Sequence, residues 1–105
     1  MNPIDAIQFY SNKTEGFVLG SDGSGTIAAV GEGLEPSIIG KKVAFLGEAW
    51  SQYKVTDTKN LVWLDEAQDL SKAANSIINP VTVLAQLSLA QKNGSKAALI
   101  NAGAS

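Results

Sequence analysis

The first half of the chain consists of short apolar runs separated by turn residues. Residues 24–31 and 40–47 are rich in apolar side chains and bounded by glycines, as short β-strands are. Residues 50–55 alternate large apolar and polar side chains at period two, and residues 61–64 form a further apolar run. Short strands with Gly, Asp and Asn turns between them predict a small β-barrel or sandwich.

The second half has a helical pattern. Asp69 or Ser71 can cap the start of a short helix, because either side chain accepts a hydrogen bond from a first-turn amide. Asn79 followed by Pro80 predicts a second helix that begins at Pro80 and ends near Lys92. At helical spacing, one face of this second helix carries Val83, Leu84, Leu87 and Ala90.

The last residues combine an apolar run with a run of small side chains. Residues 96–100 have the nearly continuous apolar character of a strand buried on both faces of a parallel sheet. Such a strand ordinarily continues, through small residues like those at 101–105, into a crossover helix and another strand. We therefore expect part of a longer protein: a β-rich part over 1–68, linking helices over 69–95 and the start of another domain over 96–105.

Composition excludes several classes of function. The chain has 105 residues, 45% hydrophobic and 17% charged, which suits one globular domain. It has no Cys and no His, which excludes thiolate and imidazole metal ligands, a Cys nucleophile and a Ser-His-Asp triad. All eight basic residues are Lys and the formal net charge is −2, so nucleic acid is not an expected partner.

The same composition bears on location. No apolar run approaches the roughly 18 residues that a membrane-spanning helix needs, so no membrane contact is expected. With no cysteine and no signal-peptide pattern, the expected location is cytoplasmic, or mitochondrial if a transit peptide precedes this sequence.

Five segments match the pattern of a known family in their order and spacing. They are Asn2-Pro3-Ile4-Asp5, Gly20 to Gly31, Gly40 to Ala44, Trp50 to Tyr53 and Asn79-Pro80-Val81-Thr82. Through these segments the chain resembles the N-terminal GroES-like domain of medium-chain dehydrogenase/reductases, in particular the zinc-free quinone oxidoreductase and enoyl reductase branches. The resemblance implies a fold that is mainly β with α: a partial GroES-like β-barrel, two helices and the first strand of a Rossmann-like domain.

The resemblance also implies an activity. It is that of a zinc-independent, NADPH- or NADH-dependent oxidoreductase that reduces a quinone or an enone by hydride transfer. The family's zinc-dependent branch has a His ligand where this chain has Gly20-Ser21-Asp22, and Ser21 cannot replace that ligand. Without zinc, reduction rests on hydrogen bonds to the substrate and on the position of the nicotinamide. The chain alone is expected to be inactive, because the family's other domain supplies most cofactor contacts.

The resemblance assigns roles to seven residues. It places Asn2 near the nicotinamide, Tyr10 as a proton donor, Asn79 and Thr82 beside the nicotinamide ribose, and Asn101, Gly103 and Ser105 in the pyrophosphate loop. Amides at the start of the helix that follows Asn79 would favour an anionic or hydroxylated ligand.

Each role has a structural alternative that the residues alone leave open. Asn2, Ser21 and Asp22 suit plain turns, and Asn79 suits a plain helix cap. Tyr10 suits a buried or half-buried aromatic position. The alternative for the whole chain is a non-catalytic GroES-like module that binds another protein, or a second copy, through an unpaired strand edge.

Overall fold

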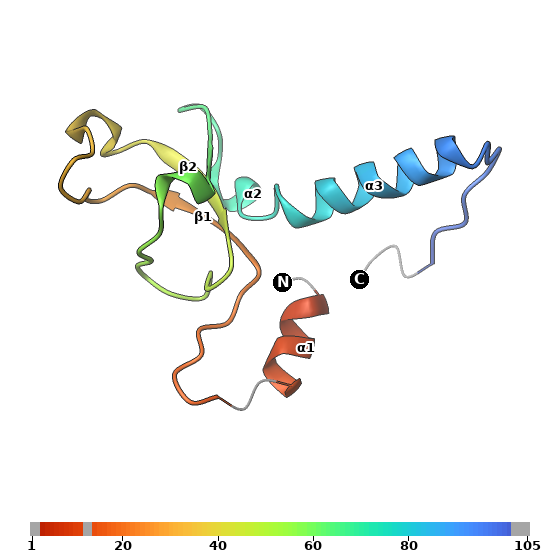
Figure 1. The fold of residues 1–105 in the computed structure, drawn as a ribbon, viewed down its shortest axis with the longest axis horizontal. Coiled ribbons are helices and arrows are strands. Elements are labelled where there is room, and N and C mark those ends of the chain that lie inside the picture. The colour runs from red at the N-terminus through yellow and green to blue at the C-terminus, as the bar shows by residue number, and fades with distance from the viewer. Residues whose placement is uncertain (1–2, 12–13, 102–105) are drawn as a thin grey trace.

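The chain folds into a small mixed α/β structure built around one sheet. A computed structural model describes residues 3–11 and 14–101. Figure 1 shows the arrangement of the elements as a ribbon. In chain order they are α1 (Pro3–Ser11), β1 (Asp22–Thr26), a 3-10 turn (Pro36–Ile38), β2 (Lys42–Leu46), a second 3-10 turn (Thr58–Asn60), β3 (Leu61–Trp63), α2 (Leu70–Ala73) and α3 (Ile78–Lys92).

The three strands form an antiparallel sheet in the order β1-β2-β3. Ser24 lies opposite Ala44, and Ala44 lies opposite Val62. Helix α2 packs on β1, where the hydroxyl of Ser24 donates to the carbonyl of Leu70 at 2.6 Å. Within the described residues the sheet is open, with β1 and β3 at its edges, and does not close into a barrel.

Two predicted strands are confirmed and a third is displaced. The segments 40–47 and 61–64 contain β2 and β3. The first strand begins two residues before the predicted segment 24–31 and ends at its third residue. After Ile27, whose carbonyl accepts from the amide of Gly40, the ladder stops because Gly40 turns the chain with a φ of 88°. The rest of the predicted segment therefore has no strand partner among the described residues.

The prediction of a strand over residues 50–55 is wrong. The left-handed backbone of Gly47 and Glu48, with φ values of 72° and 50°, turns the chain sharply as β2 ends. Lys54 then holds the segment in an irregular loop, because its Nζ donates to the carbonyl of Gly47 and to the carboxylate of Glu48. The alternating apolar and polar side chains of residues 50–55 therefore bury neither face of the segment; Val55, for example, is 99% exposed.

The helices agree only in part with the sequence pattern. Helix α2 is capped as predicted by Asp69, whose carboxylate accepts from the amide of Ser71 at 2.9 Å. Helix α3 ends at the predicted Lys92 but begins at Ile78, two residues before Pro80. Helix α1, which begins at a proline, was not predicted, because the Asn-Pro pair there indicates a turn.

The prediction of a buried strand over residues 96–100 is also wrong. This segment lies in no helix or strand, and Leu99 is 98% exposed. A strand exists only where another strand pairs with it, and no described residues lie alongside this segment in a sheet.

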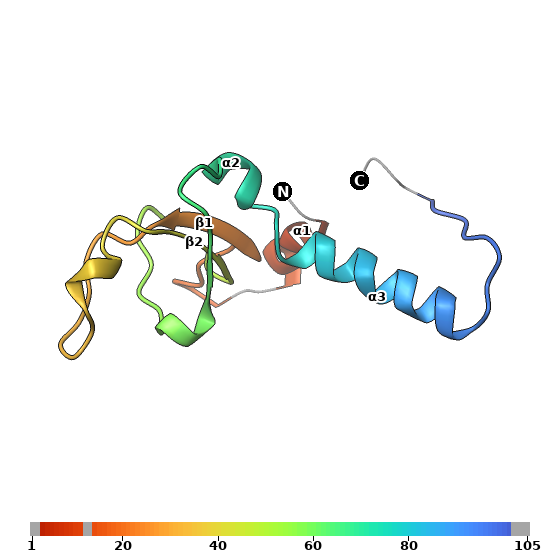
Figure 2. The same cartoon turned by 90° about the horizontal axis from the view of Figure 1, so that it is seen from above.

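The buried apolar core is small. Among the described residues only Val43, Ala44 and Ala73 are apolar and buried. The radius of gyration is 16.8 Å, whereas a compact domain of this length has about 13 Å. The chain is extended because α3 projects away from the sheet and α1 lies apart from it, below the sheet in the view of Figure 1 (Figures 1 and 2). In the described part of the chain, no helix has the length and apolar character to cross a membrane.

Candidate functional site

One hollow of about 600 Å³ lies where α1, the sheet and α3 meet. Its volume falls in the range of small-molecule sites, roughly 300–1,000 Å³. Its walls come from α1 (Pro3, Ile4, Gln8), from the strand ends (Ser21, Leu46, Gly47) and from the first two turns of α3 (Ile78, Asn79, Thr82). The structure thus brings together Asn79 and Thr82, which the resemblance assigns to the cofactor, with Ser21.

The buried carboxylate of Asp5 joins the α1 wall of the hollow to the strand ends. Asp5 is 4% exposed, and its Oδ1 accepts from the amide of Ser21 at 2.9 Å and from its hydroxyl at 2.5 Å. The carbonyl of Ser21 accepts in turn from the amide of Gly47 at 2.9 Å. This chain of bonds sets the position of α1 against the sheet and keeps Ser21 at the floor of the hollow.

A second carboxylate, that of Asp22, joins the start of α3 to the sheet. Oδ2 of Asp22 accepts from the amides of Ile78 at 2.9 Å and Ile77 at 3.4 Å, which are the first amides of α3. A carboxylate at a helix N-terminus is favourable because it satisfies amides that lack an intrahelical partner and faces the positive end of the helix dipole. The cap of α3 is therefore Asp22 from the sheet, and not Asn79 as its sequence position suggests.

The two hydroxyls of the hollow present hydrogen-bond acceptors to a ligand. The hydroxyl of Ser21 donates to Asp5, and the hydroxyl of Thr82 donates to the carbonyl of Ile78 at 2.7 Å. A hydroxyl that already donates presents lone pairs to a ligand. Asn79 donates through Nδ2 to Oδ1 of Asn75 at 2.6 Å. Ligand groups that donate, such as hydroxyls and primary amides, suit this set of side chains.

The same geometry corrects the expectation of an anion at this helix end. The two leading amides of α3 are directed at Asp22, whose Oδ1 is buried and has no hydrogen-bond partner among the described residues. An anion placed there would meet a carboxylate and not free amides. Of the two ligand classes expected at α3, the hydroxylated one fits and the anionic one does not.

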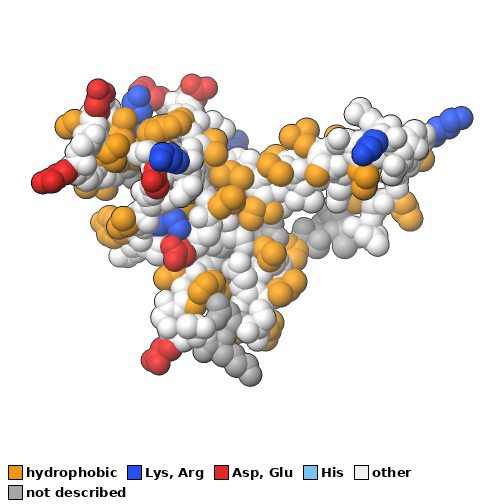
Figure 3. Space-filling view, in the orientation of Figure 1, with side chains coloured by type: hydrophobic (Ala, Val, Ile, Leu, Met, Phe, Trp, Pro, Cys, Tyr) orange, Lys and Arg blue, Asp and Glu red, His pale blue; other side chains and the backbone are white. Residues whose placement is uncertain are grey.

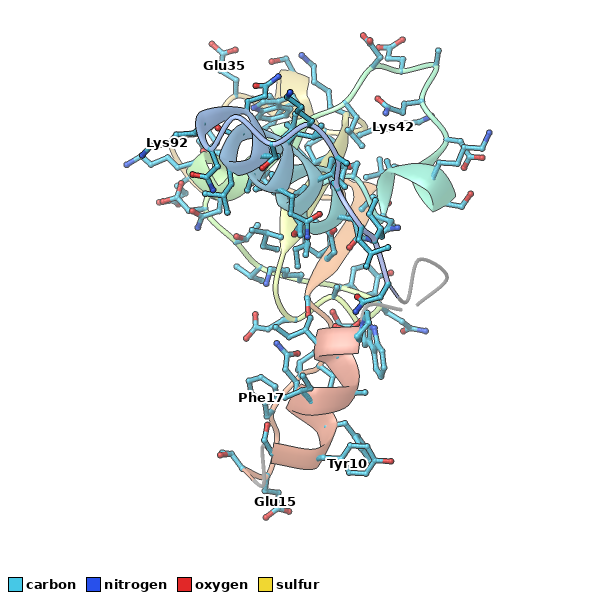
Figure 4. The ribbon with its side chains drawn as sticks, turned by 90° about the vertical axis from the view of Figure 1, so that its right-hand side faces the viewer. Tyr10, Glu15, Phe17, Glu35, Lys42 and Lys92 are labelled. Carbon is cyan, nitrogen blue, oxygen red and sulfur yellow. The ribbon has the colours of Figure 1, made fainter. Side chains whose placement is uncertain are left out.

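Two other predicted site residues that the structure describes, Tyr10 and Asn101, do not line the hollow. Tyr10 is 79% exposed near the end of α1 that points away from the sheet, as Figure 4 shows, and makes an edge-to-face contact with Phe9. The expectation that Tyr10 is buried or half-buried is wrong, since its neighbours on α1 offer no covering layer. Asn101 is exposed and lies outside every element. Asn2, Gly103 and Ser105 lie outside the described residues.

A second hollow, of about 440 Å³, lies between the sheet and the irregular loop. Ile27, Phe45 and Leu61 are among the residues around it. The ammonium of Lys54 stands 5.8 Å from the centre of the Phe45 ring, at the range where a cation is attracted to the ring face. In the part of the chain that the structure describes, no group of three or more His, Cys, Asp or Glu side chains could hold a metal ion.

Sequence reasoning missed the roles of Asp5 and Gln8. Both depend on α1, which the sequence pattern does not predict, and the bond from Ser21 to Asp5 spans 16 residues. The sequence signal for Asp5 is its residue type. A short carboxylate between apolar residues must either reach solvent or accept a hydrogen bond from a buried donor.

Comparisons with known proteins add no relative to this picture. No protein-family model, no curated protein and no solved structure matches the chain. Among the described residues, the fold and the site define a small mixed α/β chain with an open sheet and a mainly apolar hollow that carries a few polar side chains.

Proposed function

We propose that this chain is part of a zinc-independent, NAD(P)H-dependent oxidoreductase that reduces a quinone or an activated double bond, and that the hollow beside α3 receives the nicotinamide riboside. One observation carries the proposal. Asn79 and Thr82, which the family resemblance alone assigns to the nicotinamide ribose, line the same hollow as Ser21.

The chemistry of the hollow fits this half of the cofactor. A nicotinamide riboside has hydroxyls on its ribose and a primary amide on its ring, and both donate hydrogen bonds. Ser21 and Thr82 present acceptor lone pairs, because their own protons are already donated. The apolar walls from Ile4, Leu46 and Ile78 suit a flat aromatic ring. The negative charge of Asp22 disfavours a phosphate at the start of α3, so the pyrophosphate would lie elsewhere.

The proposal gives the protein a positioning role. When bound, the reduced nicotinamide supplies the hydride. The residues around the hollow would hold the ribose and the carboxamide and so orient the ring toward a substrate. Asn79 and Thr82 are exposed, so the described chain leaves this site open to water. We therefore expect weak binding and no turnover by this chain alone, because hydride transfer needs a closed and oriented site.

The sheet would then belong to a GroES-like barrel. The hollow of about 440 Å³ beside Phe45 supports this extension, since a closed barrel of this size fills its interior with side chains. Under this proposal, further strands would cover the space between the sheet and the loop that holds Lys54.

Titration with nicotinamide mononucleotide tests the proposal, followed by amide chemical shifts in nuclear magnetic resonance spectra. We expect shifts confined to the walls of the hollow, with the amides of Ser21, Gly47 and Thr82 foremost, and smaller shifts with adenosine monophosphate. The double variant Asn79→Ala/Thr82→Val should weaken binding about tenfold, as two lost hydrogen bonds of roughly 0.5–1.5 kcal/mol each would do.

A matched control removes the same groups elsewhere. Thr26→Val/Asn60→Ala deletes one hydroxyl and one amide from exposed positions outside this hollow, and binding should stay within a factor of two. Equal shifts with both nucleotides, or equal loss in both double variants, would contradict the proposal. Oxidation of NADPH by a quinone at enzymatic rates with this chain alone would contradict the expected lack of turnover.

A further inference from the structure

Gln8 lines the hollow, and its side-chain amide has no hydrogen bond to any described residue. The other polar side chains of the hollow are engaged within the chain. The hydroxyls of Ser21 and Thr82 both donate their protons, and Asn79 donates from Nδ2 to Asn75. Gln8 is half-buried, and its amide carries two N–H donors and a carbonyl acceptor. It can therefore donate to a ligand and accept from it without giving up a bond inside the protein.

The face of α1 that carries Gln8 is turned toward the hollow. Residues three and four apart lie on the same face of a helix. Gln8 follows Asp5 by three residues and Ile4, which also lines the hollow, by four. Asp5 is bonded to the amide and the hydroxyl of Ser21, so this face of the helix lies against the strand ends. The bond from Asp5 thus holds Gln8 on the α1 wall of the hollow.

The surroundings of Gln8 in the hollow are uncharged. Among the described side chains that line it there is no Asp, Glu or Lys, and Ile4, Leu46 and Ile78 supply apolar surface. On the visible face in Figure 3, hydrophobic and uncharged side chains gather where α1 and the start of α3 meet the body. A hydrogen bond between neutral groups is stronger in such surroundings than in open water, because the effective dielectric constant is lower. The ligand group that suits Gln8 is therefore neutral, and it both donates and accepts.

A primary carboxamide is such a group. Its NH2 donates and its oxygen accepts, so two primary amides can form a pair of antiparallel hydrogen bonds. Ser21 and Thr82 can accept from the NH2 group, but both have already donated the proton that the carboxamide oxygen would need. With the ribose beside Thr82 on α3, the ring lies toward the remaining walls of the hollow, and one of these is α1.

We propose that Gln8 makes the hollow specific for a carboxamide, by donating to the oxygen of the nicotinamide carboxamide and accepting from its NH2 group. The inference rests on the proposed function, because it needs the nicotinamide to lie in the hollow. The family resemblance assigns no role to Gln8. A ring that is held at both atoms of its carboxamide does not rotate freely about its bond to the ribose, so Gln8 also determines which face of the ring is open to a substrate.

Two ligands that differ in one group measure this pairing. Nicotinamide mononucleotide and acetylpyridine mononucleotide are identical except that a methyl group replaces the NH2 group in the second. We expect the unmodified chain to bind the first about three- to tenfold more tightly in titrations followed by amide chemical shifts, as the loss of one hydrogen bond predicts. Gln8→Met keeps the length and the helix propensity of the side chain and should abolish the preference.

A second variant should change the preference in the opposite direction. Gln8→Glu introduces a carboxylate that accepts from the NH2 group in a charge-assisted bond and repels the acetyl oxygen. The preference for nicotinamide mononucleotide should rise at least about twofold above that of the unmodified chain. The ring and the phosphate are the same in both ligands, so their own interactions with the carboxylate cancel in the ratio. A loss of stability in a variant cancels in the same way.

Gln91→Met is the matched control. It makes the same substitution on α3, at a residue that does not line the hollow, and the preference should stay within a factor of about 1.5 of that of the unmodified chain.

Three results would overturn the role of Gln8. Equal affinity of the unmodified chain for the two ligands, or an unchanged preference in Gln8→Met, would leave the nicotinamide in the hollow but remove Gln8 from its recognition. If neither ligand shifts the amides of Ser21, Gly47 and Thr82, the proposed function fails, and the role of Gln8 fails with it. The two failures are distinguishable because the first two results include binding in the hollow and the third does not.

Discussion

Replacing Asp5 with alanine should detach α1 from the sheet and open one wall of the hollow. Oδ1 of Asp5 accepts both the amide and the hydroxyl proton of Ser21. The two residues are 4% and 7% exposed, so water does not readily replace the lost acceptor. In Asp5→Ala both donors of Ser21 remain in a closed position without a partner.

The size of the effect follows from these contacts. A buried donor left without an acceptor costs about 1–3 kcal/mol, so two such donors cost about 2–6 kcal/mol. Removing a buried carboxylate returns part of its desolvation free energy. We expect a net loss of about 2–4 kcal/mol in the free energy that holds α1 and Ser21 in place. With only three buried apolar residues in the described core, such a loss is large for this protein.

Amide hydrogen exchange measures this free energy at the affected group. The amide of Ser21 should exchange about 30- to 1,000-fold faster in Asp5→Ala. The control is Asp57→Ala, because Asp57 also accepts a backbone amide, that of Lys59 at 2.9 Å, but in an exposed turn. It should leave the exchange of Ser21 unchanged.

A double-mutant cycle isolates the contact between the two side chains. Asp5→Ala, Ser21→Ala and the double variant should give a coupling free energy of about 1–3 kcal/mol, as expected for a hydrogen bond to a charged group. If Ser21 stays protected in Asp5→Ala, then Asp5 does not anchor α1 and the α1 wall of the hollow has another origin. A vanishing coupling would leave the Ser21 amide as the group that holds Asp5.

Two further predictions concern the turn before β1 and the cap of α2. Gly20 has a φ of 100°, and a Cβ there would lie 2.8 Å from the backbone nitrogen of Trp50, whereas Gly16 has a φ of 82° and open space. Gly16→Ala should lower the free energy of unfolding by on the order of 1–2 kcal/mol through backbone strain alone, and Gly20→Ala should lower it by more. Equal losses of the two variants in chemical denaturation would refute the contact with Trp50. The hydroxyl of Ser71, with its amide, holds the pKa of Asp69 below the usual 3.8. Since this pKa is lower in the folded state, the cap stabilises α2 above pH 3.8, and this contribution is lost as the pH falls below that value. Asp69→Asn should remove this pH dependence from the protection of the Ser71 amide against hydrogen exchange.

The parts of the fold that the sequence predicts are those that local residues determine. The segments around β2 and β3 have apolar runs between turn residues, and Asp69 lies two residues before the amide that it caps. The end of α3 follows from Gly94, which has the left-handed φ of 64° that commonly ends a helix. In each case the deciding contact lies within a few residues.

The parts that the sequence does not predict depend on distant contacts. The start of α3 is capped by Asp22, 56 residues earlier, so Asn79 and Pro80 lie inside the first turn and not before it. The alternation over residues 50–55 is the pattern of a half-buried strand, but the turn at Glu48 leaves the segment without a strand partner. Among the site residues, Asn79 and Thr82 come from the resemblance, whereas the α1 wall has only the residue type of Asp5 as a signal.

The hollow and the exposed faces of α3 are linked through the way this helix is attached. Asp22 holds its first turn against the sheet, and the residues beyond Thr82 extend into solvent (Figure 2). A helix held at one end can change its angle to the sheet at little cost, because few packed side chains resist the movement. Asn79 and Thr82 move with it, while Ser21 stays with the sheet. Whatever packs on the exposed apolar side chains of α3 therefore also sets the distance between Thr82 and Ser21.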